Sequence, residues 1–569
     1  MKLTGAQILC QSLIEEGVEV IFGYPGGVLL PFYDTLPQYP QLRHILVRHE
    51  QGAAHAADGY ARASGKVGVC LATSGPGATN LVTGIANACL DSSPMVAITG
   101  QVPRALIGKD AFQEVDITGI TLPITKHNYL ITDAGSVAKT VKEAFYLART
   151  GRPGPVLLDF PRDVFVEKAD FNYPSQVDLP GYRPTMHGNS LQIKKAAKVI
   201  NEAQHPVIIA GRGVIISGAC DELRELAEKA QIPVVSTLLG IGCFPESHPL
   251  SFGMLGMHGT YVANQAVSGC DLVIAIGMRF DDRATGRLSD FAPNARIIHI
   301  DIDPAEIGKN VRVDVPVVGD IRAVLNPLNK QVEEARHTEW FEKLDKMRDR
   351  HLPGYKTRDG GLPPQLVIDK ICEVTGGEAI VVTGVGQNQM WSAQHYCYNK
   401  PNRLISSGGL GTMGFELPAA FGAKIGRPDD TVWCIAGDGG FQMTIQELAT
   451  IAQEKAAVKI AILNNGYLGM VRQWQELFYG KRYVATPLLC PDFVKIAEAY
   501  CIPALNVTRR EEVMPALKKA MADPGPFLIN FVVEPEENVY PMVPPGAALH
   551  EVMEEPSNRE VESWPKNTP

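Results

Sequence analysis

The chain has 569 residues, which is too long for one hydrophobic core and predicts three to four domains at about 150 residues each. The 53 basic and 62 acidic side chains give a formal net charge of −9, which disfavours a general nucleic-acid or anionic-membrane binder. A hydrophobic fraction of 45% and a charged fraction of 20% indicate a packed globular chain and exclude extended disorder.

The 11 cysteines are scattered, and no two have C-x-x-C spacing. Most of them, such as Cys70, Cys270 and Cys434, lie in apolar runs, which favours buried reduced thiols over a zinc site or a disulfide framework. The amino terminus has no signal-peptide core, and every apolar run is shorter than the roughly 18 residues of a membrane helix. These features predict a soluble, cytoplasmic protein.

Short apolar strands alternate with helices in three successive blocks. The chain opens with a predicted helix over residues 4–16, capped by Thr4 with Gln7 completing a capping box. The predicted strands of the first block are 18–22, 45–47, 67–72, 95–99 and 156–160. Those of the second are 207–210, 234–236, 272–276 and 297–302, and those of the third are 379–383, 432–436, 459–463 and 528–533. This alternation predicts an α/β protein of three doubly wound parallel-sheet domains.

Changes in composition divide the chain. We expect an N-terminal domain over residues 1–165, a polar Pro/Gly-rich linker over 166–190 and a central domain over 191–330. A charged segment and a loop form a second linker over 331–365, and a C-terminal domain follows over 366–540. The last residues, 541–569, are Pro-rich and acidic and predict a tail or flap.

The third block carries the strongest local signal for chemistry. Its strand 432–436 leads into the sequence GDGG at 437–440, and its strand 459–463 leads into NNGY at 464–467. Asp438 and Asn465 are 27 residues apart, a suitable length for one strand–helix–strand crossover, so both should lie at carboxyl ends of neighbouring parallel strands. A carboxylate and an amide oxygen beside flexible glycines suit Mg²⁺ and a ligand diphosphate, although either tetrapeptide alone reads equally as a tight turn.

This spacing resembles that of the thiamine-diphosphate-dependent enzymes. The resemblance implies a glutamate at a strand end in another block, and Glu50 follows the predicted strand 45–47 within RHEQGAA at 48–54. In that superfamily the glutamate acts on the cofactor's aminopyrimidine ring, so that the ring can remove the C2 proton of the thiazolium. Such a role suits a carboxyl group in an apolar pocket with a raised pKa.

Over nearly its whole length the sequence resembles the catalytic subunit of acetohydroxyacid synthase, also called acetolactate synthase. The motifs that carry this resemblance, in chain order, are GYPGG at 23–27, GQVP at 100–103, DAFQE at 110–114, MLGMHG at 254–259, RFDDR at 279–283, SGGLGTMG at 407–414 and LGMVRQWQ at 468–475.

The resemblance implies roles for individual residues and names the domains as pyrimidine-binding, central FAD-binding and diphosphate-binding. The implied catalytic residues are Glu50, Gly27, Gln113, Met413 and Trp474. Thiamine diphosphate is expected to contact Glu50, Val385, Gln387, Gly411, Met413, Gly437, Gly439, Gly440, Asn465, Tyr467 and Met470. The Met413 side chain is expected to keep the cofactor bent. Mg²⁺ is expected to be held by Asp438, Asn465 and the Tyr467 carbonyl.

The resemblance also implies FAD in the central domain, where the sequence has no G-x-G-x-x-G after a strand. The sequence GRG at 211–213 follows one predicted strand, and Asp301 ends another, where it could accept ribose hydroxyls. The residues implied for FAD are Arg152, His258, Gly277, Arg279, Asp301 and Asp320. The overall reaction needs no electron transfer, so the flavin is expected to be structural.

The reaction implied is decarboxylation of pyruvate on thiamine diphosphate, followed by ligation of the two-carbon unit to pyruvate or 2-ketobutyrate. The products, 2-acetolactate and 2-aceto-2-hydroxybutyrate, lead to branched-chain amino acids. A homodimer or homotetramer and a small regulatory subunit are implied as well. A flavin-dependent pyruvate oxidase, another 2-keto acid decarboxylase and a catalytically silent flavoprotein scaffold are the alternatives.

Three residues depart from the family pattern. Val28 stands where alanine is common, Arg162 where lysine is common, and Asn388 where histidine is frequent. None of the three removes a catalytic group. Val28 and Arg162 fall where the resemblance puts the substrate channel, so they bear on its width and on inhibitor sensitivity.

Overall fold

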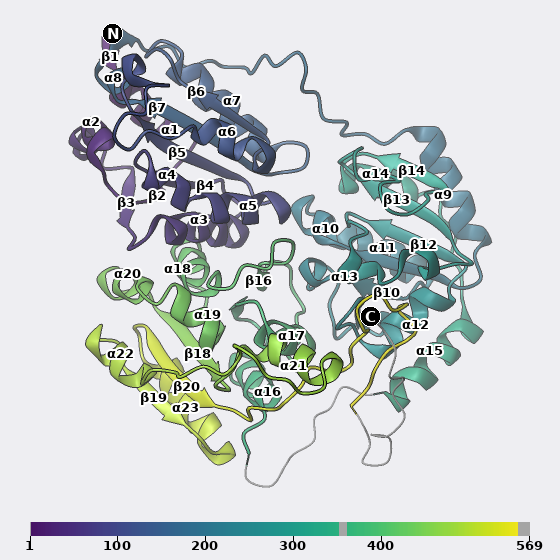
Figure 1. The fold of residues 1–569 in the computed structure, drawn as a ribbon. Coiled ribbons are helices and arrows are strands. Elements are labelled where there is room, and N and C mark those ends of the chain that lie inside the picture. Colours follow the sequence, from purple (N-terminus) through teal and green to yellow (C-terminus); the bar gives the residue numbers. More distant parts are fainter. Residues whose placement is uncertain (1, 352–360, 556–569) are drawn as a thin grey trace. The chain divides into compact units, whose positions relative to one another are not determined.

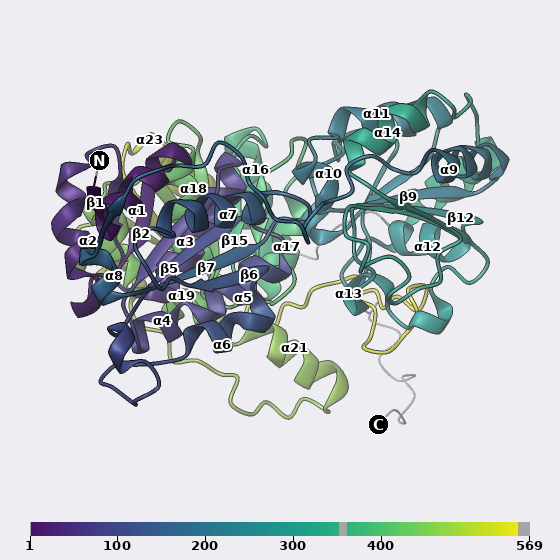
Figure 2. The same ribbon diagram turned by 90° about the horizontal axis from the view of Figure 1, so that it is seen from above.

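The computed structural model describes residues 2–351 and 361–555, and it forms two compact units. Unit 1 combines Met1–Pro184, Thr357–Ser392 and Asn402–Glu536, and so contains an N-terminal and a C-terminal lobe. Unit 2 combines Thr185–Lys356, Ala393–Pro401 and Glu537–Pro569. The two units are described separately (Figures 1 and 2).

The N-terminal lobe of unit 1 is a six-stranded parallel sheet with helices on both faces. Its strands, in sheet order, are β3 (Arg43–Leu46), β2 (Val20–Gly23), β4 (Gly68–Ala72), β5 (Met95–Gln101), β7 (Pro155–Pro161) and β6 (His127–Leu130). The principal helices are α1 (Gly5–Glu15), α3 (Glu50–Ser64), α5 (Val82–Leu90) and α7 (Val137–Arg149), with the shorter α2 (Leu30–Thr35), α4 (Pro76–Asn80), α6 (Ile117–Thr121) and α8 (Arg162–Val166). Helix α1 begins after Thr4, and the predicted capping box with Gln7 is present.

The C-terminal lobe repeats this topology. Its strands, in sheet order, are β16 (Leu404–Ser406), β15 (Ile380–Thr383), β17 (Val432–Gly437), β18 (Val458–Asn464), β20 (Phe527–Val532) and β19 (Ala504–Val507). Its helices are α16 (Pro364–Thr375), α17 (Gln387–His395), α18 (Glu416–Gly426), α19 (Asp438–Met443), α20 (Glu447–Gln453), α21 (Gly469–Phe478), α22 (Phe493–Ala499) and α23 (Arg510–Ala522). In both lobes the third strand along the chain pairs with the first, on the side opposite the second. Each sheet therefore has a switch point, where open α/β sheets bind ligands beyond the carboxyl ends of their strands.

The two lobes meet through helices α3 and α18, which lie side by side in Figure 1. Glycines allow the helix backbones to touch. A Cβ at Gly59 would lie 2.1 Å from the Ala419 carbonyl oxygen, and one at Gly422 would lie 1.9 Å from that of Ala56. A single cluster of buried apolar side chains, from Phe22 to Leu528, extends through both lobes.

Unit 2 is built on a third parallel sheet. Its strands, in sheet order, are β11 (Ser251–Met254), β10 (Val234–Ser236), β9 (Pro206–Ala210), β12 (Leu272–Ile276), β13 (Arg296–Asp301) and β14 (Val315–Val318). Its helices include α9 (Ser190–Glu202), α10 (Arg212–Ile216), α11 (Cys220–Ala230), α12 (Tyr261–Gly269), α13 (Asp282–Thr285), α14 (Ile321–Asn329) and α15 (Thr338–Arg350). In chain order this sheet reads 3-2-1-4-5-6, the strand order of dinucleotide-binding folds.

Predicted and observed elements differ in identifiable places. The predicted strands are present with shifts of up to two residues. The edge strands β6, β11, β14, β16 and β19 and the antiparallel pair β1 (Lys2–Thr4) and β8 (Lys168–Asp170) were not predicted. The sequence left a tight turn open as the alternative at 437–440, whereas helix α19 begins directly at Asp438.

The described part of the predicted tail, residues 541–555, packs into unit 2. Val543 and Leu549 are buried there, and the Val543 N–H donates to the Met257 carbonyl oxygen at 2.7 Å. Residues 556–569 lie outside the described part of the chain. No described helix is both long enough and apolar enough to span a bilayer.

Replacing Gly422 by alanine should separate α3 from α18, because the new methyl group would overlap the Ala56 carbonyl oxygen. We expect a loss of at least about 1–3 kcal/mol in the free energy of unfolding, the usual effect of overpacking, measured as a lower midpoint in thermal unfolding. Gly269→Ala is the control, since its Cβ would lie 3.6 Å from Trp340, an ordinary contact. Equal midpoints for both variants would contradict the argument.

Glu416, the first residue of α18, makes stability depend on pH. Its carboxyl oxygens are buried with no side-chain partner among the described residues, and burial raises its pKa from 4.5 to about 7, with the Glu416 and Gly414 backbone N–H groups acting in the opposite direction. Between pH 4.5 and about 7 the unfolded chain releases this proton while the folded chain keeps it, so the wild type loses stability as the pH rises.

Glu416→Gln should therefore gain stability relative to the wild type between pH 4.5 and pH 8, by up to about 3 kcal/mol for a shift of this size. Chemical denaturation at the two pH values measures the difference. The exposed Glu498→Gln should give the same difference from the wild type at both values. A Glu416→Gln variant that behaves like Glu498→Gln would refute the assignment of the buried proton.

Candidate functional site

The segments that follow β17 and β18 lie directly beside each other, as predicted. These two strands are parallel neighbours, with Gly437 paired to Leu463. The Gly466 N–H donates to Asp438 Oδ2 at 2.7 Å, and the Gly439 N–H donates to Asp438 Oδ1 at 2.8 Å. Asp438 and the 464–467 turn therefore lie at the same edge of the sheet, as the 27-residue spacing between Asp438 and Asn465 predicts.

A pocket opens at this edge, at the switch point between β15 and β17. It is lined by Val385, Gly386, Gln387, Asn388, Trp391, Met413, Gly437, Asp438, Gly439, Gly440, Leu463, Asn465, Tyr467, Leu468, Gly469, Met470 and Val471. Most of the residues implied for the diphosphate end of the cofactor are in this set. Gly411 is not, but a Cβ there would lie 3.9 Å from Val385 Cγ1, so it is adjacent.

Glycines bring the backbone close to other pocket residues. A Cβ at Gly469 would lie 2.1 Å from Gln387 Oε1 and 2.7 Å from Asn465 Nδ2. A Cβ at Gly439 would lie 2.8 Å from Leu468 Cδ2. These positions form a cradle that a larger side chain would fill, as expected where backbone N–H groups bind an anion.

The donors around Asp438 fit a magnesium ion shared with a ligand. No group of three or more His, Cys, Asp or Glu side chains that could hold a metal is found among residues 2–351 and 361–555. A single carboxylate, the Asn465 amide oxygen and the Tyr467 carbonyl would leave the remaining positions to water and phosphate oxygens, as Mg²⁺ prefers. Burial raises the pKa of Asp438, with the Cys490 thiol and the Gly466 N–H acting in the opposite direction. A bound cation would favour the ionised carboxylate.

Several pocket contacts were not predicted from the sequence. Gln387 Nε2 donates to Gln473 Oε1 at 2.9 Å, and Asn465 Nδ2 donates to Gln387 Oε1 at 3.2 Å, so a buried amide chain fixes the Asn465 side chain. The Cys490 thiol donates to Asp438 Oδ2 at 3.3 Å, and burial raises the pKa of this thiol to about 12. No local motif marks Cys490. Trp391 lines the pocket. Its indole Nε1 is buried and has no hydrogen-bond partner among the described residues, which suits a bound polar group.

Helix α21 carries Met470, implied as a cofactor contact, and Trp474, implied as a catalytic residue. Met470 lines the pocket, and Trp474 lies one turn further along the helix, outside the lining. The Trp474 ring packs edge-on against Phe478, with centroids 5.9 Å apart. The structure therefore places Trp474 beside the pocket rather than in its wall.

The implied catalytic residues of the N-terminal lobe gather around its own switch point. Glu50 begins α3, half-buried, and Asn80 Nδ2 donates to Glu50 Oε2 at 3.0 Å. A Cβ at Gly77 would lie 3.3 Å from Glu50 Oε1. Glu50 does not line the pocket that contains Asp438. The sequence offered no signal for Asn80.

Two further residues lie around the same switch point. Gln113 has a positive φ of 60° and packs against Gly75, where a Cβ would lie 2.8 Å from its carbonyl oxygen. Gly27 follows Gly26, which is pressed against Thr73. The buried hydroxyls of Thr73 and Ser74 have no hydrogen-bond partner among the described residues.

The three departures from the family pattern have distinct surroundings. Asn388 is buried, lines the pocket and donates through Nδ2 to the Ile435 carbonyl oxygen at 2.9 Å, so it braces the end of β17. Val28 packs against Gly100, where a Cβ would lie 2.4 Å from Val28 Cγ2. Arg162 is exposed at the start of α8.

The switch point of unit 2 lies between β9 and β12, and glycines pack there. The Gly213 N–H donates to the Gly277 carbonyl oxygen at 2.9 Å, and Gly277 has a positive φ of 60°. A Cβ at Gly211 would lie 2.3 Å from that same oxygen. The GRG sequence therefore forms the closely packed start of α10 at the place where this strand order binds a dinucleotide, despite the missing fingerprint.

The other residues implied for FAD are dispersed. Asp301 ends β13 and accepts from the Asp303 N–H at 2.9 Å, while Asp320 caps α14 by accepting from the Ala323 N–H at 3.1 Å. Arg279 Nη2 lies 3.7 Å from Asp281 Oδ2, and burial lowers the pKa of His258 to about 4, so its ring is neutral. Arg152 belongs to unit 1 and donates to Ser92 Oγ at 2.9 Å.

Comparison with known proteins agrees with this arrangement. Three family models match: "Thiamine pyrophosphate enzyme, N-terminal TPP binding domain" over residues 3–120, the "central domain" over 193–328 and the "C-terminal TPP binding domain" over 384–531. Curated relatives include an acetolactate synthase from Mycobacterium leprae, 53% identical over 97% of this chain and 90% of its own length.

Two further relatives show similar coverage. The acetolactate synthase large subunit of Corynebacterium glutamicum is 52% identical over 97% of this chain and 90% of its own length. A probable acetolactate synthase large subunit of Methanocaldococcus jannaschii is 52% identical over 97% of this chain and 95% of its own length. With three matching domains and relatives similar over nearly the whole length, the chain belongs to the acetolactate synthase large-subunit family of thiamine pyrophosphate-dependent enzymes.

Proposed function

We propose that this protein decarboxylates pyruvate with thiamine diphosphate and Mg²⁺ and joins the two-carbon unit to pyruvate or 2-ketobutyrate. The products are 2-acetolactate and 2-aceto-2-hydroxybutyrate, precursors of branched-chain amino acids. The single observation that carries the proposal is the juxtaposition of Asp438 with the 464–467 turn, at a switch-point pocket that also contains Met413 and Gln387. Family membership supplies the reaction class.

The residues divide the work between binding and proton transfer. Asp438, Asn465 and the Tyr467 carbonyl hold Mg²⁺, and the backbone at Gly437, Gly439 and Gly440 approaches the diphosphate. When bound, thiamine diphosphate supplies the nucleophilic carbon that adds to the pyruvate keto group and accepts the electron pair released with CO₂.

The wall of the pocket and Glu50 prepare the bound ring system. Met413 lines the pocket near Gly439, where a Cβ would lie 3.6 Å from Met413 Cε, and would provide an apolar surface against which the cofactor is positioned. Glu50 exchanges a proton with the aminopyrimidine ring nitrogen. Gly27 and Gln113, around the same switch point as Glu50, bound the space for the acceptor.

We propose that the Glu50 paired with one pocket comes from a second copy of the chain. Glu50 lies at the switch point of the other lobe and outside the pocket lining, which supports a site completed by a homodimer or homotetramer. A regulatory small subunit is proposed from the large-subunit names of the relatives. The 11 cysteines are scattered with no C-x-x-C spacing, which supports a reducing, cytoplasmic compartment.

FAD is proposed for unit 2 as a structural cofactor. The 3-2-1-4-5-6 strand order and the glycine contact between Gly211 and Gly277 support a dinucleotide at that switch point. Asp301 and Asp320 supply carboxylates on loops at the carboxyl ends of this sheet, and His258 and Arg279 belong to the same unit. Since the reaction transfers no net electrons, chemical reduction of the flavin should leave carboligation intact.

Product analysis decides between this reaction and its alternatives. With pyruvate, Mg²⁺ and thiamine diphosphate, we expect 2-acetolactate without oxygen uptake, and with equal pyruvate and 2-ketobutyrate a mixture of both products. Trp474 and Met470 should favour the ethyl acceptor by about 10- to 200-fold, because one methylene is worth about 1–3 kcal/mol. Acetate formed with oxygen uptake would identify an oxidase, and acetaldehyde would identify a simple decarboxylase.

Replacing Glu50 by glutamine should lower kcat by on the order of 10²–10⁴-fold, the usual contribution of general acid–base catalysis. Cofactor affinity should change little, because the isosteric amide can still accept from Asn80. Steady-state turnover and calorimetric titration with thiamine diphosphate measure the two effects. Glu19→Gln, which removes an exposed carboxylate paired with Lys66, is the matched control. If Glu50→Gln and this control had the same turnover, Glu50 would take no part in proton transfer. The protein would then be interpreted as a non-catalytic scaffold.

A further inference from the structure

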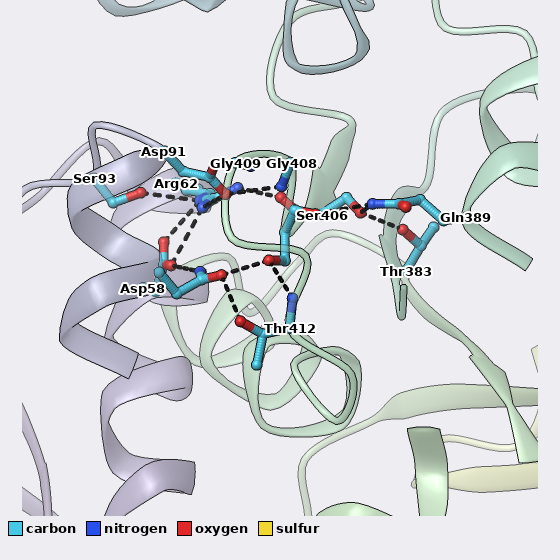
Figure 3. Close-up of polar contacts among 12 residues, drawn as sticks. Asp58, Arg62, Asp91, Ser93, Thr383, Gln389, Ser406, Gly408, Gly409 and Thr412 are labelled. Carbon is cyan, nitrogen blue, oxygen red and sulfur yellow. Dashed lines mark hydrogen bonds and ion pairs between the residues drawn. The ribbon is translucent and has the colours of Figure 1, made fainter. Parts of the chain in front are cut away.

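A buried arginine in the last turn of α3 joins the two lobes of unit 1. Arg62 Nε donates to Asp58 Oδ1 at 2.7 Å and to Ser93 Oγ at 3.0 Å, and Arg62 Nη2 donates to Asp91 Oδ2 at 2.7 Å. Its remaining arm, Nη1, crosses to the other lobe and donates to the Ser406 carbonyl oxygen at 2.6 Å. Figure 3 shows the guanidinium between these groups.

Asp91, which ends α5, binds the same segment of the C-terminal lobe. The Gly409 N–H donates to Asp91 Oδ1 at 2.7 Å, and the Gly408 N–H donates to Asp91 Oδ2 at 3.0 Å (Figure 3). One carboxylate thus accepts from two consecutive backbone amides and from Arg62. This fixes the start of residues 407–412, referred to below as the 407–412 loop.

Asn87, one turn earlier on α5, holds the two ends of the loop together. Ser407 Oγ donates to Asn87 Oδ1 at 2.5 Å, Thr412 Oγ1 donates to the same oxygen at 3.2 Å, and the Thr412 N–H donates to Ser407 Oγ at 2.8 Å. Asn87 Nδ2 in turn donates to Asp58 Oδ2 at 2.7 Å. The loop is therefore closed on itself and attached to the N-terminal lobe by the same side chain.

The other side of the loop is attached to the pocket. Gln389 Nε2 donates to Ser406 Oγ at 2.7 Å and to the Ser407 carbonyl oxygen at 3.0 Å. Thr383 Oγ1 donates to Ser406 Oγ at 2.6 Å (Figure 3). Thr383 ends β15, two residues before Val385, and Gln389 lies two residues after Gln387. Both flanking residues line the pocket.

This network would lower the stability of the fold if any of its buried charges lacked a hydrogen-bond partner, because its charged side chains are inaccessible to water. Asp58 and Ser93 are 0% exposed, Asp91 is 2% exposed and Arg62 is 4% exposed. Although burial alone would lower the pKa of Arg62, the Asp58 and Asp91 carboxylates raise it, so the guanidinium stays charged. Satisfied buried networks of this kind rigidify what they hold.

We propose that Arg62, Asn87 and Asp91 are positioning residues that hold the 407–412 loop, and with it Gly411 and Met413, in the conformation that receives thiamine diphosphate. The loop ends one residue before Met413, which lines the pocket, and Gly411 needs its positive φ of 72°. None of the three residues touches the pocket, so they act through the loop. The inference rests on the proposed function only in naming the ligand.

The test compares two polar contacts between the lobes, that of Asp91 with the 407–412 loop and an ion pair elsewhere. Asp91→Asn removes the carboxylate that accepts from both loop amides but keeps the Arg62–Asp58 pair. Glu454→Gln removes the Arg43–Glu454 pair, 2.5 Å long, which also joins the lobes but lies outside the network. In cofactor-free protein, hydrogen exchange at 406–414 should accelerate in Asp91→Asn and stay at the wild-type rate in Glu454→Gln.

Thiamine diphosphate with Mg²⁺ is then titrated calorimetrically. The dissociation constant should rise about tenfold in Asp91→Asn, since misplaced positioning groups cost one to two orders of magnitude, and kcat at saturating cofactor should fall less. Unchanged exchange at 406–414, or an affinity within twofold of Glu454→Gln, would overturn the proposal. If Asp91→Asn does not fold, Ser407→Ala replaces it in both measurements, hydrogen exchange at 406–414 and the dissociation constant. This variant leaves every charge of the network in place. A wild type that binds thiamine diphosphate but forms no acetolactate would refute the proposed function alone, because exchange and binding need no turnover.

Discussion

The contact between α3 and α18 is the constraint on which unit 1 depends. The two helices approach until backbone touches backbone, which is possible only because Gly59 and Gly422 have no side chain. Apolar side chains of both lobes then form one cluster, so the lobes share a core rather than a polar interface. The buried ion pairs beside this contact have lost contact with water, and they are tolerated because their charged groups are hydrogen-bonded on several sides.

Much of the fold and part of the site could be predicted from the sequence for physical reasons. Parallel strands that are buried on both faces form continuous apolar runs, so the central strands of all three sheets were visible. The crossover length between Asp438 and Asn465 fixed their common edge, because carboxyl ends of neighbouring parallel strands coincide. Half-exposed strands such as β6 and the short pair β1–β8 have no such pattern and were missed.

What could not be predicted depends on contacts between distant segments. Arg62 and Asp91 are ordinary charged residues in helical sequence, and only the packing of two lobes shows that both are buried against the 407–412 loop. Cys490 and Asn80 are likewise unmarked, although each holds a carboxylate proposed to be functional. For Trp474 the family resemblance names a role, but the residue is not in the lining of the pocket, whereas Met470 is.

Helix α3 has a proposed functional group near each end. Glu50 is its first residue, and Arg62 lies in its last turn, about 18 Å away at 1.5 Å per residue. The glycine contact fixes the helix against α18 between these two points, and both residues belong to one continuous helix, so a shift of that contact would move both ends together. The position of this one helix therefore sets the placement of both Glu50 and the 407–412 loop. A change that moves one of them also moves the other.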